Sequence, residues 1–142
     1  MGTEHTLSIA AYRIGNQIDR LLSKELAELG ISYTQALLLC ELDRAPSHSA
    51  SQTKLREYLR ITPATMSALV KRMVKNGYLK KQSAAEDQRV HIISLTSKAA
   101  ALIPAISDCL DRAEDMFCKE FSQDEKEYVT ALSDKMQMVL ME

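Results

Sequence analysis

The sequence predicts a mainly α-helical protein with one small β-hairpin. Apolar residues recur at the three- and four-residue steps of a helix through most of the chain, whereas residues 90–95 are rich in β-branched side chains and follow a second strand-like segment, 78–82. The chain has 142 residues, 46% of them hydrophobic and 26% charged, which is typical of a single globular domain. This composition argues against a disordered or low-complexity chain.

The first two helices are marked by their ends. Apolar residues at helical spacing run up to Gly30, which is a natural C-terminal stop. Ser32 and Gln35 then form a capping box, because each side chain can satisfy a free backbone N–H at the start of a helix. We expect a long helix before Gly30 and a short helix over residues 33–43.

Two more helices are expected in the middle of the chain. Pro46 and the serines up to residue 51 interrupt the helical spacing and predict a loop, after which Leu55 marks a short third helix. Thr62 and Pro63 predict the start of a fourth helix over residues 62–76, because a capping hydroxyl precedes a proline whose missing N–H costs nothing there. The expected core-facing stripe of this helix is Met66, Leu69, Val70 and Met73.

The C-terminal third predicts two long helices. Thr96 or Ser97 caps the first, and Pro104 inside it predicts a kink or a late start, because proline removes one backbone hydrogen bond. Ser122 and Glu125 form a second capping box that opens the last helix. Both helices, like the first helix of the chain, carry apolar stripes that a chain of this size cannot cover alone.

Charge is unevenly distributed, although the whole chain has a net charge of only −1. Residues 54–91 carry nine basic and three acidic side chains, a net charge of +6, whereas the segments 1–53 and 98–142 have net charges of −2 and −5. A basic middle between acidic ends indicates that only the middle of the chain contacts a polyanion.

The third and fourth helices are joined by a tight turn at residues 60–62, which suits a helix-turn-helix with its second helix in the DNA major groove. Small side chains let that helix approach the bases, and basic residues one turn later reach phosphates. The alternative is an ordinary amphipathic surface helix with a solvated basic face. The candidates for DNA contact are Thr65, Ser67, Ala68, Lys71 and Arg72.

The polar segment between the two expected strands holds Asp87 and Arg89. Such a hairpin can act as a wing, because an arginine suits the narrow, negatively charged minor groove and a carboxylate two residues earlier can orient the guanidinium. The alternative is a surface ion pair that contributes under about 1 kcal/mol to stability.

Taken together, these pieces resemble the MarR family of bacterial winged-helix transcriptional regulators. The resemblance covers nearly the whole chain, and its most specific part is the Asp-x-Arg wing at 87–89, ahead of the Ser-Leu-Thr at 94–96. Its other pieces are residues 32–35, 55–59, 65–67, 69–70, 72–73 and 77–79.

The resemblance implies one domain over residues 1–142. It places a winged helix-turn-helix over residues 32–96, between dimerisation helices in residues 1–30 and 97–142. These two flanking segments hold the uncovered apolar stripes, so pairing with a second copy would bury them.

The function that the resemblance implies is transcriptional repression by a homodimer on a palindromic DNA operator. Helix 62–76 of each chain would lie in the major groove and wing 83–90 in the minor groove. The alternative, which the small net charge permits, is a winged-helix module that binds a protein instead of DNA.

The chain departs from the family pattern in and after its wing. Many relatives have an additional arginine before the wing Asp and a charged residue after it, but those positions here hold Ala84, Ala85, Glu86 and Gln88. The wing is therefore less basic, although Lys80 and Lys81 lie at its base. Lys98 and Ala99 replace a glycine common after the Leu-Thr pair, a change expected to affect only the helix start.

Relatives that bind aromatic acids do so where the first, second and fifth helices meet the winged region. By resemblance, Tyr33 lines this cleft, with Arg13 and Asn16 of the first helix as neighbours, for a small aromatic or anionic ligand that releases the DNA. The alternative for Tyr33 is plain packing at a junction between elements.

The three cysteines, an odd number without a zinc-like pairing motif, fit reduced thiols in a cytoplasmic protein. Cys40 lies among leucines and is expected in the core. Cys109 and Cys118 would be about 13.5 Å apart along a continuous helix, too far for a disulfide. A thiol-based redox switch, which some relatives have, is the alternative.

Other classes of function find no support in the sequence. No metal-ligand spacing links His5, His48 and His91, and no phosphate loop, nucleophile elbow or Cys-x-x-Cys motif indicates an enzyme or a cofactor. The apolar runs are too short for a membrane helix or a signal peptide, so we expect a cytoplasmic protein without a membrane partner.

Overall fold

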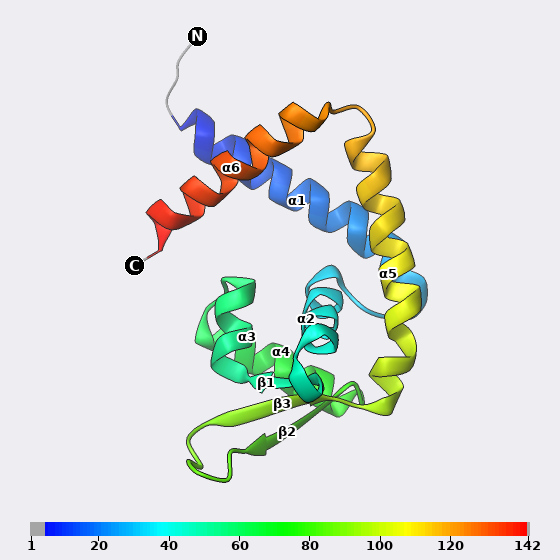
Figure 1. Cartoon of the computed structure of the whole chain (residues 1–142), viewed down its shortest axis with the longest axis vertical. Coiled ribbons are helices and arrows are strands. Elements are labelled where there is room, and N and C mark those ends of the chain that lie inside the picture. Colours follow the sequence, from blue (N-terminus) through cyan, green and yellow to red (C-terminus); the bar gives the residue numbers. More distant parts are fainter. Residues whose placement is uncertain (1–4, 142) are drawn as a thin grey trace.

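A computed structural model describes residues 5–141, and its winged helix-turn-helix lies at one end of a frame of long helices (Figure 1). Residues 1–4 and 142 of the expected dimerisation segments lie outside the described residues. The predicted class, mainly α-helical with a β-hairpin wing, is confirmed. The helices are α1 (Thr6–Leu26), α2 (Tyr33–Arg44), α3 (Gln52–Leu59), α4 (Pro63–Lys75), α5 (Ser97–Cys118) and α6 (Gln123–Leu140), with 3-10 turns η1 (Ala27–Leu29) and η2 (Pro46–His48).

The strands form a small antiparallel sheet in the order β1-β3-β2, with β1 at Ser49–Ser51, β2 at Leu79–Ser83 and β3 at His91–Leu95. The β2–β3 hairpin agrees with the sequence prediction, but the loop expected up to residue 51 is wrong at its end, which forms β1. Ser49 of β1 pairs with Ser94, and their hydroxyl oxygens are 2.8 Å apart. So short a polar segment becomes a strand only by pairing with β3, which its own sequence does not reveal.

Most of the apolar stripe predicted for α4 lies in the core. Met66, Val70 and Met73 are fully buried, because positions three and four residues apart share one face of a helix. Leu69 is only partly buried, so it lies at the margin of that face. The fully buried residues around the stripe come from four other helices and from β3, and they include Leu26, Leu38, Leu39, Leu42, Leu55, Ile93 and Ile106.

The helices begin at the predicted caps. Ser32 and Ser122 each form a complete capping box, and the Thr62 and Thr96 hydroxyls accept backbone N–H bonds at the starts of α4 and α5. Helix α5 then runs unbroken through Pro104, so the late start expected there is wrong. Proline leaves the Ala100 carbonyl without its usual donor.

The junction between α4, β2 and α5 corrects another expectation. Lys98 Nζ donates a hydrogen bond to the Asn76 carbonyl at 2.8 Å and lies 4.7 Å from the centroid of the Tyr78 ring. Thr96 Oγ1 donates to the Gly77 carbonyl at 2.6 Å. Lys98 therefore affects more than the start of its own helix, since it ties α5 to the end of α4.

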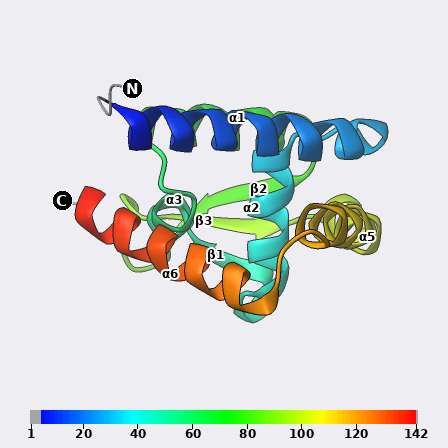
Figure 2. The same ribbon diagram turned by 90° about the horizontal axis from the view of Figure 1, so that it is seen from above.

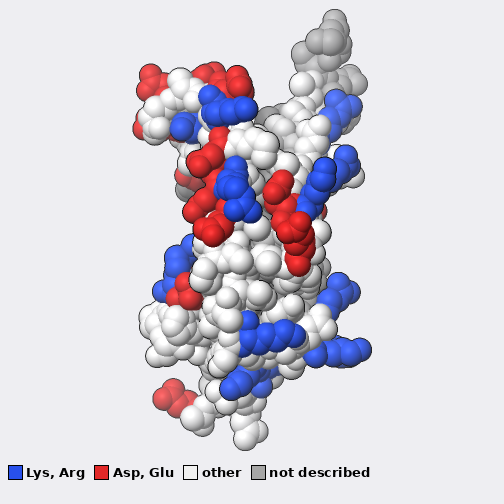
Figure 3. All heavy atoms as spheres, turned by 90° about the vertical axis from the view of Figure 1, so that its right-hand side faces the viewer, with Lys and Arg blue, Asp and Glu red and all other residues white. Residues whose placement is uncertain are grey.

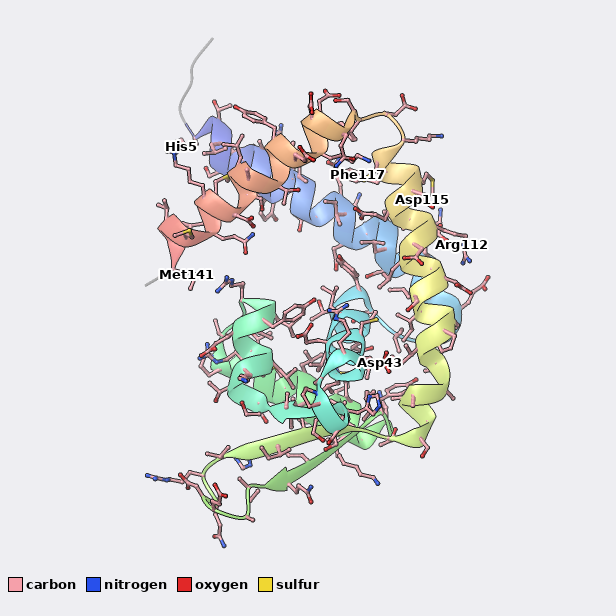
Figure 4. The ribbon with its side chains drawn as sticks, viewed as in Figure 1. His5, Asp43, Arg112, Asp115, Phe117 and Met141 are labelled. Carbon is pink, nitrogen blue, oxygen red and sulfur yellow. The ribbon has the colours of Figure 1, made fainter. Side chains whose placement is uncertain are left out.

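Helices α1 and α6 form two separate arms. They overlap in Figure 1, but the view from above shows them apart, with α2 and α3 visible between them (Figure 2). Helix α6 buries none of its residues within the chain. Phe117, near the turn from α5 into α6 (Figure 4), is 45% exposed, and Val129 is 59% exposed. These arms leave a large apolar surface uncovered.

Candidate nucleic-acid interface

The turn before α4 sets the angle between the two helices of the helix-turn-helix. Arg60 closes α3 in the left-handed region, with φ 59°, and its backbone N–H donates to the α3 carbonyls of Arg56 and Glu57. Arg56 also donates from its guanidinium to the Ile61 carbonyl at 3.4 Å. A left-handed arginine at this position turns the chain sharply toward Thr62.

The solvent face of α4 carries the residues that the sequence predicts as DNA contacts. They lie opposite the buried side chains of Met66 and Val70, so this face is free to approach a partner. All five predicted residues are exposed: Thr65, Ser67, Ala68, Lys71 and Arg72.

The first hydroxyl on this face is fixed by the helix cap. Thr62 Oγ1 accepts the backbone N–H of Thr65 at 3.2 Å and donates to Thr65 Oγ1 at 2.9 Å. The hydrogen of the Thr65 hydroxyl therefore remains free to donate outward, toward an acceptor on a base or a phosphate.

The loop between β2 and β3 is organised by Asp87. Its Oδ1 accepts hydrogen bonds from the Arg89 backbone N–H at 2.9 Å and from Arg89 Nε at 3.2 Å, and its Oδ2 accepts from Arg89 Nη2 at 3.2 Å. The hydrogen bonds from the Arg89 side chain, and to a smaller extent the one from its backbone N–H, hold the pKa of Asp87 below its ordinary value. The Arg89 side chain is 91% exposed, so a bidentate contact holds an otherwise free guanidinium in one orientation.

The helix and the wing meet at a shallow hollow. Ser67 of α4 and Arg89 of the wing both line it, together with Thr53 and Arg56 of α3 and with His91 of β3. The sequence offers no local signal for the two α3 residues, because their side chains reach this face only through the packing of α3 against α4. The structure thus places Ser67 of the predicted α4 face and Arg89 of the wing on one surface.

The charge of the molecule is divided between its two ends. On the side that α5 faces, acidic side chains gather in the upper half, and Lys and Arg predominate in the lower half (Figure 3). The lower half contains the wing base and the C-terminal end of α4, both of which belong to the basic segment 54–91. This division agrees with the segment charges in the sequence.

The three candidate ligand residues lie on α1 and at the start of α2. Arg13 and Asn16 are exposed on α1, whereas Tyr33 is half-buried and packs against the core. Burial and the carboxylates of Glu114 and Asp19 raise the pKa of Tyr33. A raised pKa keeps the Tyr33 hydroxyl protonated, while the side chain packs against the core.

The cysteines differ in burial: Cys109 is buried, whereas Cys40, expected in the core, and Cys118 are only partly buried. Cys109 Sγ donates to the Glu25 carbonyl at 3.7 Å. Burial raises the pKa of Cys40, and burial together with a hydrogen bond to Glu114 raises the pKa of Cys118. A raised pKa reduces the fraction of reactive thiolate. Since α5 is continuous, Cys109 and Cys118 lie too far apart along it to pair.

Two further features bear on other classes of function. Among residues 5–141, no three His, Cys, Asp or Glu side chains gather in a way that could hold a metal ion. In the same part of the chain, no helix has the length and apolar character needed to cross a bilayer.

Comparison with known proteins finds relatives that are named as HTH-type transcriptional regulators. A model described as MarR family matches residues 29–90. The HTH-type transcriptional regulator PrsX of Escherichia coli is 27% identical over 137 residues, covering 94% of this chain and 80% of the relative. The HTH-type transcriptional regulator MgrA of Staphylococcus aureus is 28% identical over 141 residues, covering 95% of this chain and 92% of the relative.

Solved structures share the whole fold. A MarR mutant from Escherichia coli complexed with operator DNA matches with a TM-score of 0.84 and 20% identity, covering 96% of this chain and 99% of that one. The MepR–DNA complex of S. aureus matches with a TM-score of 0.84 and 22% identity, covering 93% and 96%. This chain is therefore similar to MarR-family regulators: the family model matches its residues 29–90, and relatives named HTH-type transcriptional regulators are 27–28% identical over nearly all of it.

Proposed function

We propose that the protein is a homodimeric repressor that binds a palindromic DNA operator in a sequence-specific manner. In each protomer, residues 62–76 lie in the major groove and the wing, residues 83–90, lies in the flanking minor groove. The observation that carries this proposal is the single exposed surface on which the α4 face and the oriented Arg89 guanidinium meet, within the only strongly basic segment. The DNA complexes of MarR and MepR support the same partner here.

The roles of the site residues follow from their positions. Thr65, Ser67 and Ala68 read base edges, because short side chains let the helix axis approach the floor of the groove. Lys71 and Arg72 bind phosphates, which contribute affinity without sequence information. Arg89 enters the minor groove, and Asp87 orients it.

In this proposal, the segments 1–30 and 97–142 form the dimer interface, and residues 32–96 form the DNA-binding region of a single domain. The exposed apolar side chains of α1 and α6 support it, since a lone chain leaves Leu7, Val129 and Leu140 more than half exposed. Two-fold symmetry of the dimer would place two copies of α4 in successive major grooves, which requires a palindromic operator.

A gel shift with DNA from upstream of the protein's own gene tests the proposal. One discrete complex should form at a ratio of one dimer per duplex, and unlabelled upstream DNA should compete far better than random DNA. A reporter driven by the same region should be less active when the protein is present. Equal competition by random DNA would contradict sequence-specific binding, and no shift at low salt would favour the protein-binding alternative.

We further propose that a small aromatic or anionic ligand, bound near Arg13, Asn16 and Tyr33, weakens DNA binding. The support is the position of Tyr33, whose backbone N–H donates to Ser23 of α1 at 3.2 Å at the junction of α1 and α2. Benzoate serves as the probe. It should raise the melting temperature of the parent protein and not that of Arg13→Ala; equal shifts in both would remove Arg13 from the site.

A further inference from the structure

A second hollow lies on the other side of the α4–wing contact. Lys71 and Val74 of α4 form one wall, Lys81 and Gln82 of β2 form the other, and His91 of β3 closes it. Ser67 and His91 line this hollow and also the hollow that contains Arg56 and Arg89. The two hollows therefore adjoin along the seam between the recognition helix and the wing.

The charged side chains that line this seam are all basic. Its charged side chains are Arg56, Lys71, Lys81 and Arg89, and neither hollow has an Asp or Glu in its lining. By contrast, glutamates line the hollow between α5 and α6 and the one beside η2. Like charges that face each other across a groove repel one another, so an anion between them would relieve the repulsion.

We propose that the seam seats the phosphodiester backbone that separates the major groove from the minor groove, and that Lys81, His91 and Arg56 bind its phosphates. This inference rests on the proposed function. When a helix occupies one groove and the adjoining wing occupies the next, the DNA strand between the grooves must cross the surface between them. That surface is the seam, and its small Ser67 side chain leaves room for a phosphate oxygen.

The register of the hairpin decides which lysine takes part. Lys81 pairs with the fully buried Ile93, and residues directly opposite in a ladder share one face of the sheet. Lys81 therefore lies on the face that turns toward the core and α4. Its neighbour Lys80 pairs with Ser94 and lies on the opposite face, because successive side chains alternate. The two lysines share charge, strand and exposure, so Lys80 is a matched control.

The test measures the dependence of DNA affinity on salt for Lys81→Gln, Lys80→Gln and His91→Gln, with fluorescence anisotropy on the upstream duplex. Each phosphate contact contributes about 0.9 to the slope of log K against log salt, and each residue occurs twice in a dimer, so Lys81→Gln should reduce the slope by about 1.8. Lys80→Gln should keep the parent slope. His91→Gln should weaken binding several-fold at every salt concentration through the lost contact.

Arg56→Gln provides a second measurement in the other hollow and should also reduce the slope, with circular dichroism and melting temperature confirming that the variant is folded. A Lys81→Gln slope equal to that of the parent, or an equal reduction in Lys80→Gln, would overturn the inference while leaving the proposed function in place. Failure of the folded parent to bind duplex DNA would overturn both.

Discussion

At the scale of single residues, Arg89 bears the strongest expectation. Its guanidinium is held by Asp87 and, among residues 5–141, makes no other hydrogen bond or ion pair, so its removal should not disturb the core. Arg89→Ala should cost on the order of 1–3 kcal/mol of DNA affinity per half-site, about 5- to 150-fold, with the melting temperature unchanged. Asp87→Ala, which keeps the charge of Arg89, should cost less. Fluorescence anisotropy measures both, and an Arg89→Ala variant that binds like the parent would remove the wing from recognition.

The second prediction concerns the pH dependence of the pair formed by Asp87 and Arg89. Its pKa is lowered in the folded protein by the hydrogen bonds from Arg89, so the pair is intact above the ordinary carboxyl pKa and is lost as the pH falls through the lowered value. An NMR titration of the parent should therefore place the Asp87 pKa below that of an unperturbed Asp. In Arg89→Ala it should rise toward the ordinary value, and an identical titration in both proteins would show that the pair is absent in solution.

The residues of the site differ in how far the sequence reveals them. The Asp87–Arg89 pair is predictable, because both partners lie within one loop and their spacing fixes the contact. The exposed face of α4 is predictable from helical periodicity. Arg56 and Thr53 are not, because they reach the seam through the packing of α3 against α4, and the orientation of Lys81 requires the strand register.

At the scale of elements, two residues of the apolar stripe predicted for α4 differ in how deeply they are buried. Met66 is fully buried, so Met66→Ala should destabilise the protein by about 2–5 kcal/mol through lost burial and a cavity. Leu69→Ala should cost less, because Leu69 is only partly buried. Urea denaturation measures the free energies of unfolding of the two variants. A larger loss for Leu69→Ala would contradict the packing described for α4.

The errors in the predicted elements have a common origin. Capping residues locate the starts of α2, α4, α5 and α6 because a cap is a local interaction. The strand β1, the unbroken course of α5 through Pro104 and the contact of Lys98 with the end of α4 all depend on partners distant in sequence. The winged helix-turn-helix as a whole is recognisable from the sequence, because its helix caps, apolar stripes and strand segments follow one another in a characteristic order along the chain.

At the scale of the whole molecule, the arms α1 and α6 expose apolar side chains that the proposed dimer would bury. Helix α6 buries nothing within its own chain, and Val129 and Leu132 lie on its exposed apolar side. The parent should therefore have the mass of a dimer in light scattering. A double substitution, Val129→Glu with Leu132→Glu, should yield monomer or aggregate, and a chain ending at Ser122 should be insoluble or unfolded. A soluble, DNA-binding monomer from either would defeat the proposed dimer.

The central claim is that the basic winged region binds the phosphates of duplex DNA. The most direct measurement is the affinity of the parent dimer for its upstream duplex as salt rises from roughly 50 to 200 mM, by fluorescence anisotropy. A dimer with two segments of net charge +6 should release several counterions, so binding should weaken at least about tenfold over this range. An affinity that stays flat across the same range would contradict the claim and favour a protein partner.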